Sequence, residues 1–304
     1  MKTYVKDIDK DEIRSGFLVT TDRKKIWNKE IELLMEVDRI CKKYDIKYFA
    51  VDGTMLGCAR HNGFIPWDDD IDVAMMRPDY MQFIEVAPKE IKDSYFLQNA
   101  YTDTRIMNWS KLMDETTSAI EDWEAYDTHQ GVFVDVFPLD IVSDVTERSS
   151  IIDDMIKELW MCVIMPHKVA ELLTCNTNTH VALKTLKRII DMPLAERMSI
   201  YEDFCVKHFS ESSKVAIQTA YWCDRAKPVD KNLFKQTKYM PFEQTQIPML
   251  EQFEYYLDGK YNNWRTPVKS PNLHEGIFMS VDIPYDFMMK NINRDLLRTV
   301  EPSW

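Results

Sequence analysis

The chain has 304 residues, of which 45% are hydrophobic and 29% are charged, and its formal net charge is -12 at pH 7. This composition is typical of a globular protein with one large or two small domains, and it excludes a wholly disordered chain. The acidic balance disfavours a general nucleic-acid binder, which needs a basic face. A nucleotide can still bind an acidic protein where a metal ion bridges the like charges.

The sequence carries no clear targeting signal. Residues 1–23 mix charges and have no apolar core, so we expect no secretory signal. The longest apolar run, residues 159–166, is shorter than the roughly 20 residues of a membrane span. We expect a buried helix there, with peripheral contact at a membrane surface as the alternative. The six cysteines form no C-x-x-C pair, which favours reduced thiols in a cytoplasmic protein.

The first half of the chain predicts alternating helices and strands. Apolar residues at helical spacing predict a helix over residues 26–44, and a short strand over residues 47–51 follows. Thr54 is expected to cap a helix that runs to residue 60, where a Gly-containing turn ends it. The remaining predictions here are strands over residues 70–76, 95–98, 106–113 and 131–137, and a helix over residues 79–86.

The second half of the chain has a more helical pattern. Helices are predicted within residues 149–173 and 181–209, a strand over residues 215–221, and a short helix at the end of residues 242–257. We therefore predict an α+β fold. Residues 1–145 would form an α/β core and residues 146–304 a mostly helical region, with a single domain as the alternative.

A cluster of carboxylates is the most informative feature of the sequence. Asp70 and Asp72 alternate with apolar residues on a predicted strand, so both side chains point to one face. Two adjacent carboxylates repel each other unless a cation lies between them, and Mg²⁺ prefers such oxygen ligands. Asp135, which alternates with valines on another predicted strand, is a candidate third ligand.

This cluster has two alternative interpretations. A solvated acidic turn would need no ion, but the apolar residues on both sides of the cluster argue against it. An EF-hand-like calcium loop starting at Asp68 would need Gly at its sixth position, where this chain has Val73.

The residues around the cluster carry a family resemblance. The sequence Asp-Gly-Thr-Met-Leu-Gly at 52–57, followed by Arg-His-Asn-Gly-Phe-Ile-Pro-Trp-Asp-Asp-Asp-Ile-Asp at 60–72, resembles the signature of the LicD family. This family includes bacterial phosphocholine transferases and is related to the fukutin-type enzymes. Further similar segments lie at residues 110–116, 131–140, 238–243 and 247–248, so the resemblance spans about residues 26–264. One departure is the sequence Tyr-Asn-Asn-Trp at 261–264, where the family usually has a Tyr-Gly-Asp-Tyr-like element.

The resemblance implies a nucleotidyltransferase-like fold, with a mixed sheet flanked by helices and an added helical region. By the same likeness, Asp70, Asp72 and Asp135 would bind Mg²⁺, with Mn²⁺ as an alternative. Gly53 and Thr54 would mark the helix start that cradles a phosphate.

The resemblance also implies a reaction. A phosphocholine-like group would pass from a CDP-linked donor to a sugar hydroxyl of a cell-surface glycan, such as lipopolysaccharide or teichoic acid, or of its lipid-linked precursor. Asp135 is the first candidate for the base and Asp68 the second. Candidate phosphate contacts are Arg60, His61 and Lys111. Two alternatives stay open: a nucleotidyltransferase that moves a nucleoside monophosphate, and a non-catalytic nucleotide-binding protein.

Overall fold

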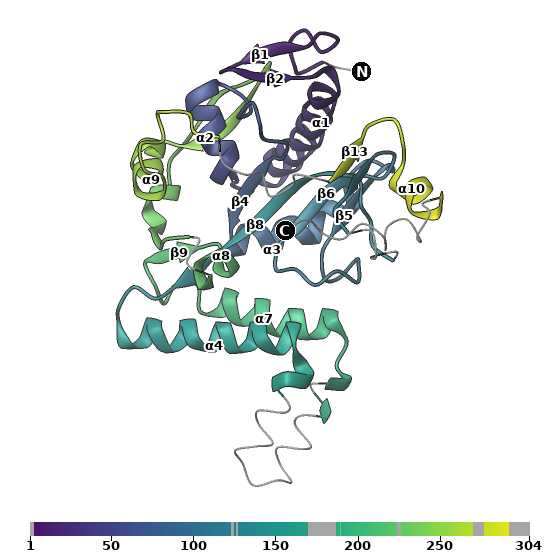
Figure 1. Cartoon of the computed structure of the whole chain (residues 1–304). Coiled ribbons are helices and arrows are strands. Elements are labelled where there is room, and N and C mark those ends of the chain that lie inside the picture. Colours follow the sequence, from purple (N-terminus) through teal and green to yellow (C-terminus); the bar gives the residue numbers. More distant parts are fainter. Residues whose placement is uncertain are drawn as a thin grey trace.

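A central mixed sheet organises the protein (Figure 1). The computed structural model describes residues 3–122, 125, 127–169, 187–188, 190–223, 226–269 and 277–291, and the structural statements below concern these residues. The sheet has seven strands: β3 (Phe49–Ala50), β4 (Asp72–Met76), β5 (Tyr95–Gln98), β6 (Ser110–Asp114), β8 (Val132–Val142), β9 (Lys214–Ala216) and β10 (Val229–Asp230). Together with its flanking helices, this sheet of parallel and antiparallel pairs confirms the predicted α+β fold.

Strand β8 is the centre of the sheet. It pairs in parallel with β4 on one side and antiparallel with β6 and β9 on the other. Nearly every residue of β8 is buried, as expected for a strand covered on both faces. The strand continues to Val142, beyond the predicted end at residue 137.

Helices pack around this sheet. They are α1 (Thr21–Tyr44), α2 (Asp52–His61), α3 (Arg77–Val86), α4 (Glu147–Ile164), α7 (Leu194–Lys207), α8 (Gln218–Trp222), α9 (Phe253–Lys260) and α10 (Tyr285–Asn291). Helix α1 contacts β8 and β6, and α3 contacts β4 and β8. Helices α4 and α7 lie side by side at the lower end of the view in Figure 1. The remaining strands form small pairs: β1 (Glu12–Arg14) with β2 (Phe17–Val19), β7 (Ser118–Ile120) with β13 (Phe278–Ser280), and β11 (Thr237–Phe242) with β12 (Thr245–Leu250).

Helix α1 illustrates how the sequence sets an element. The Thr20 side chain accepts a hydrogen bond from the Arg23 N–H and so caps the first turn, which places the start of the helix before the predicted residue 26. Asp45, with φ of 54°, ends the helix in the left-handed conformation that Asp tolerates. Between these ends, buried residues such as Ile31 and Leu34 pack into the main core.

The sheet continues across the predicted boundary at residue 145. Strands β9 and β10, from the second half of the chain, join the C-terminal end of β8. In addition, Arg77 of α3 forms a buried ion pair with Glu202 of α7. These contacts favour the single-domain alternative, and the two-domain division stays a prediction.

Several local predictions are wrong. Thr54 does not cap α2, because the helix already begins at Asp52. The strand predicted over residues 215–221 ends at Ala216, and the chain then turns into α8. The β11–β12 hairpin was not predicted.

Other predictions fall partly on residues that the structure does not describe. Parts of the helices predicted within residues 149–173 and 181–209, namely residues 170–173, 181–186 and 189, lie outside the described residues, as does Cys175. The five cysteines that are described, Cys41, Cys58, Cys162, Cys205 and Cys223, are free thiols. Within the described segments, no helix combines the length and apolar character needed to cross a membrane.

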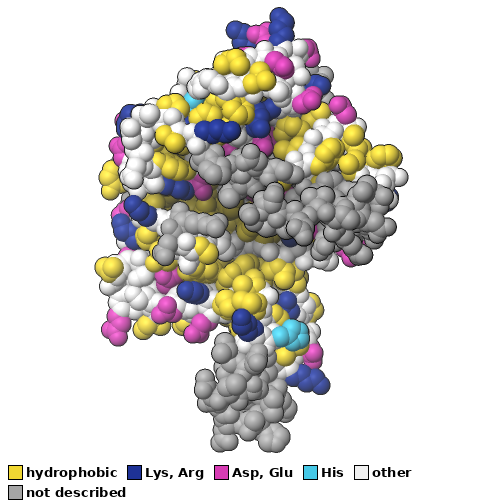
Figure 2. Space-filling view, viewed as in Figure 1, with side chains coloured by type: hydrophobic (Ala, Val, Ile, Leu, Met, Phe, Trp, Pro, Cys, Tyr) yellow, Lys and Arg dark blue, Asp and Glu magenta, His cyan; other side chains and the backbone are white. Residues whose placement is uncertain are grey.

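Charged side chains are intermixed on the surface. On the face shown in Figure 2, the described basic side chains are scattered among acidic ones, and hydrophobic side chains gather just above the α4–α7 pair.

Candidate functional site

The acidic loop before β4, which contains Asp68, Asp69 and Asp70, is anchored to helix α1. The Arg23 guanidinium and the Trp27 indole N–H both donate to the Asp68 carbonyl oxygen, at 2.7 Å and 2.9 Å. Trp27 also stacks on Phe64, with ring centroids 4.7 Å apart. Because Arg23 and Trp27 lie one turn apart on α1, one face of the helix fixes the path of the loop.

The start of helix α2 lies against the same loop. A Cβ atom added at Gly53 would lie only 2.6 Å from Asp68 Oδ2, so glycine allows this carboxylate to approach the helix start. The Thr54 hydroxyl accepts a hydrogen bond from the Asp72 N–H at 2.8 Å. The Gly-Thr pair therefore positions two carboxylates of the acidic segment, which its place in the sequence alone did not indicate.

Asp72 and Asp135 are direct neighbours on adjacent parallel strands. They are register partners in the β4–β8 ladder, and the Asp135 N–H donates to the Ile71 carbonyl at 3.0 Å. Burial and the nearby carboxylates of Asp70 and Asp135 raise the pKa of Asp72 well above its usual value. Burial raises the pKa of Asp135 to about 6, although the Lys111 ammonium opposes this shift.

Two residues hold Asp135 in place: Lys111 on the neighbouring strand β6, and Trp109, which directly precedes that strand. The Trp109 indole N–H donates to Asp135 Oδ1 at 2.7 Å, and Lys111 Nζ lies 3.8 Å from the same oxygen. Lys111 lies closer to Glu121, with both carboxylate oxygens at 2.9 Å, and Arg105 pairs with Glu121 as well. Lys111 is thus a buried cation that lies between Asp135 and the Glu121–Arg105 ion pair.

The carboxylates can accommodate a hard cation. Asp68, Asp69 and Asp70 each offer an oxygen, and these oxygens lie within 4.8 Å of one another. The predicted ligands Asp72 and Asp135 are not members of this group, although Asp70 acts electrostatically on both of them. An all-oxygen donor set of closely spaced carboxylates fits Mg²⁺ or Mn²⁺ and offers no soft ligand for a thiophilic metal.

Arg60 and His61 lie at the opposite end of α2 from Gly53. The Arg60 Nε donates to His61 Nε2 at 2.9 Å, and its Nη1 donates to the Trp264 carbonyl at 2.8 Å. Burial and the neighbouring arginines lower the pKa of His61 to about 4, so its imidazole is neutral at pH 7. The predicted contacts of Arg60 and His61 with a phosphate stay predictions. Because its imidazole is neutral at pH 7, His61 would contact the phosphate without a positive charge.

One residue far along the chain, Glu243, completes the support of the loop. Glu243, a position the family resemblance covers without suggesting a physical role, accepts from Arg14 Nη1 and from the Phe64 N–H. Its backbone N–H donates to the Asn62 carbonyl at 2.7 Å. A Cβ added at Gly63 would collide with the Glu243 side chain, so glycine allows Glu243 to approach this closely.

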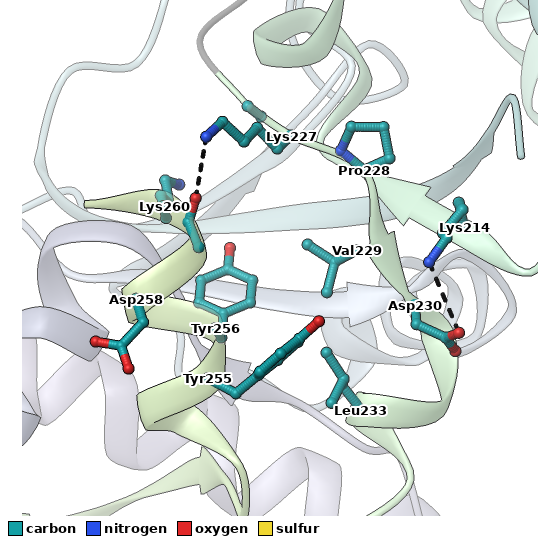
Figure 3. Close-up of a pocket in the computed structure, with 12 residues that line it drawn as sticks. Lys214, Lys227, Pro228, Val229, Asp230, Leu233, Tyr255, Tyr256, Asp258 and Lys260 are labelled. Atoms are coloured by element: carbon teal, nitrogen blue, oxygen red, sulfur yellow. Dashed lines mark hydrogen bonds and ion pairs between the residues drawn. The ribbon is translucent and has the colours of Figure 1, made fainter. Parts of the chain in front are cut away.

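A cavity of about 410 Å³ lies between α9 and the segment that contains β10 (Figure 3). Tyr255 and Tyr256 of α9 face Val229 and Leu233 across it, and Lys260 lies at its margin. This volume is within the range of about 300–1,000 Å³ that is typical of small-molecule sites.

The end of α9 connects the cavity to the start of α2. Lys260 forms an ion pair with Asp52, the first residue of α2, and burial lowers the pKa of Lys260 to about 8. The next residue, Tyr261, is close enough to Asp72 and Asp68 that their carboxylates add to the effect of burial in raising its pKa. In the sequence, the only indication of this segment is that residues 261–264 differ from the element that the LicD family usually has there.

Comparison with known proteins agrees with this site. Residues 45–172 match the family model described as LicD/FKTN/FKRP, nucleotidyltransferase domain. The chain carries a LicD-family domain. The match includes the start of α2, the acidic loop, β4, Lys111 and Asp135, so the predicted family resemblance is confirmed.

Individual relatives match the chain over short stretches. The lipopolysaccharide cholinephosphotransferase LicD of Haemophilus influenzae is 46% identical over 61 residues, which are 20% of this chain and 23% of that protein. Uncharacterized proteins of Rickettsia typhi and Rickettsia prowazekii are 38% and 36% identical over 58 residues, 19% of this chain in each case. The matched stretch thus spans about a fifth of each curated relative.

Proposed function

We propose that this protein transfers a phosphocholine-like group from a CDP-linked donor to a hydroxyl group of a glycan, with Mg²⁺ as its cofactor. The observation that carries the proposal is the in-register pairing of Asp72 and Asp135 beside the Gly53–Thr54 helix start, inside a LicD-family domain. The name of the Haemophilus relative, a lipopolysaccharide cholinephosphotransferase, supports this substrate class. A lipopolysaccharide-type glycan or its lipid-linked precursor is the acceptor we propose.

The carboxylates would have separate tasks. Asp70, Asp72 and Asp135 would hold Mg²⁺ or, as an alternative, Mn²⁺. When bound, the ion would neutralise the donor's diphosphate and the charge that develops at phosphorus. The backbone N–H groups at the start of α2 would lie against a phosphate oxygen, since a helix start favours negative charge.

A carboxylate would also accept the proton of the acceptor. The acceptor oxygen would form a bond to the donor's distal phosphorus while the bond to the CMP oxygen breaks. The hydroxyl proton would pass to Asp135, the register partner of Asp72 in the β4–β8 ladder. Trp109 and Lys111 would hold Asp135 in place, and Asp68 is the second candidate for this task.

The cavity lined by Tyr255 and Tyr256 would take the nucleoside part of the donor. Its tyrosine rings offer flat apolar surface for a base, and Lys260 lies between this surface and the start of α2, where the phosphates would bind. A cytoplasmic location, with contact at the inner face of the membrane where a lipid-linked acceptor would lie, belongs to the same proposal.

A second candidate function is nucleotidyl transfer. The description of the matching family model names a nucleotidyltransferase domain, and the same carboxylates would serve attack on the other phosphorus of the donor. The two reactions differ in their products, since one releases CMP and the other transfers it.

The test is the release of CMP from CDP-choline in the presence of Mg²⁺. Asp70→Asn and Asp72→Asn should each lower the rate about a hundredfold or more, the scale of removing one electrostatic stabiliser. Asp79→Asn is the matched control, because Asp79 is a half-buried carboxylate on α3 whose charged neighbours are Lys47 and Asp45. Equal rates in all four proteins, or no release by any of them, would refute the proposal.

A further inference from the structure

Two opposite charges lie side by side in the wall of the cavity between α9 and the segment that contains β10 (Figure 3). Lys214 begins β9 and Asp230 ends β10, and the two residues are partners in the antiparallel register of these strands. Lys214 Nζ lies 3.8 Å from Asp230 Oδ2, which is longer than a hydrogen bond. The strand pair thus holds a donor next to an acceptor without a direct hydrogen bond between them.

The backbone fixes the direction of the Asp230 carboxylate. Its Oδ1 accepts a hydrogen bond from the Asn232 N–H at 2.8 Å and so caps the short helix η2 (Lys231–Phe234). This contact leaves Oδ2 for a donor from the cavity. The side chains of Lys214 and Asp230 are 38% and 39% exposed, so a ligand can reach both of them. An ion pair this exposed contributes little to stability.

The opposite side of the cavity leads to the start of α2. In Figure 3, Lys260 lies across the cavity from Lys214 and Asp230, and the ring of Tyr256 lies between these two ends. Lys260 pairs with Asp52, the first residue of α2, where the phosphates of the donor would bind. A nucleotide whose base stacks on the tyrosine ring would therefore turn the edge of that base toward Lys214 and Asp230.

We propose that Asp230 and Lys214 recognise the base of the donor and select cytosine over uracil. The exocyclic amine of cytosine would donate to Asp230 Oδ2, and its ring N3 would accept from Lys214 Nζ. Uracil in the same orientation would present a carbonyl oxygen to the carboxylate and an N–H to the ammonium, so both contacts would be repulsive. This selectivity rests on the proposed CDP-linked donor, but it concerns recognition of the base and not the transfer step.

Calorimetry with CDP and with UDP, each in the presence of Mg²⁺, tests this selectivity. The wild-type protein should bind CDP about tenfold or more tightly than UDP, because the wrong base leaves two polar groups unpaired. Asp230→Asn should reduce this ratio below about threefold, because an amide can donate to uracil as well as accept from cytosine. Lys214→Met should also reduce the ratio, because the ammonium no longer opposes the N–H of uracil.

A matched control is available on α9. Glu254 is 62% exposed, pairs with Arg265 and does not line the cavity, so Glu254→Gln should keep the wild-type ratio. CDP and UDP carry the same charge, so a general loss of charge or of stability would weaken both affinities and leave their ratio unchanged. If Asp230→Asn does not fold, Lys214→Met decides the question.

Two results would overturn the assignment. One is a wild-type protein that binds CDP and UDP equally well, or binds neither of them. The other is a preference for CDP that persists unchanged in Asp230→Asn and Lys214→Met. Failure of the transfer reaction is a separate result. A preference for CDP without CMP release from CDP-choline would support recognition of cytosine and refute the transfer, whereas CMP release without any preference between the bases would do the opposite.

Discussion

The buried charge cluster around Arg77 makes a quantitative prediction about stability. Arg77 is fully buried, and its Nε and Nη2 donate to the two oxygens of Asp140 at 2.7 Å and 2.5 Å. Its Nη1 donates to Glu202 at 3.0 Å, and the Tyr101 hydroxyl donates to the other oxygen of Glu202. The cluster joins α3, β8 and α7, which belong to both halves of the chain.

Replacing Arg77 with Met would leave two carboxylates buried without their cation. Breaking a buried ion pair in this way costs about 3–5 kcal/mol of unfolding free energy. With an unfolding entropy of roughly 2.1 cal/mol/K per residue, a loss of about 4 kcal/mol lowers the Tm of this 304-residue chain by about 6 °C. Arg77→Lys should lose less, because it keeps the charge but not the paired hydrogen bonds to Asp140.

Urea and thermal unfolding of the variants would measure this effect. Arg148→Met is the matched control: Arg148 pairs with Glu211 at 2.6 Å, but on the surface, so its loss should matter little. A single transition in both experiments is expected, since β9, β10 and α7 are tied to the N-terminal strands. An Arg77→Met protein no less stable than Arg148→Met would refute this reasoning. Two separate transitions would support the two-domain division at residue 145 instead.

Three further predictions concern the site. Burial lowers the pKa of His61 from its usual 6.5 to about 4. Its neutral form therefore contributes stability that is fully present above pH 6.5 and is lost as the pH falls toward 4. In urea unfolding, His61→Gln should lose less stability between pH 7 and pH 5 than the wild type does. Gly53→Ala should slow CMP release at least tenfold while far-UV circular dichroism stays unchanged, because the added Cβ would displace the Asp68 carboxylate, and an unchanged rate would contradict this close approach. Burial lowers the pKa of Lys260 to about 8, so its ammonium group loses its proton as the pH rises through 8. The affinity of the wild type for CDP, measured by calorimetry, should fall over this range. The affinity of Lys260→Met should be weaker and independent of pH there.

The sequence predicted the features that depend on local pattern. The alternating apolar residues predicted a strand over residues 70–76, and β4 forms over Asp72–Met76, so Asp72 lies on the strand but Asp70 lies in the loop before it. The alternating valines likewise indicated the strand that carries Asp135. The register that makes Asp72 and Asp135 neighbours comes from the β4–β8 pairing, which no local pattern contains.

Features that depend on distant contacts could not be predicted. Glu30 lies on a helix with a regular apolar pattern, and only the fold shows that its carboxyl group is buried without a hydrogen-bond partner among the described residues. Glu243 supports Phe64 from 179 positions further along the chain. The β11–β12 hairpin was missed because Pro241 and Pro248, which disfavour strands, lie within its two strands.

The central claim is that this site transfers a phosphorylated substituent and releases CMP. The most direct test offers the same protein preparation CDP-choline in one reaction and CTP in another, each with Mg²⁺, and follows CMP and pyrophosphate. The account predicts CMP from CDP-choline, abolished by Asp72→Asn, and no pyrophosphate from CTP. Pyrophosphate from CTP without CMP from CDP-choline would identify a nucleotidyltransferase instead, and the absence of both products would contradict catalysis of either kind.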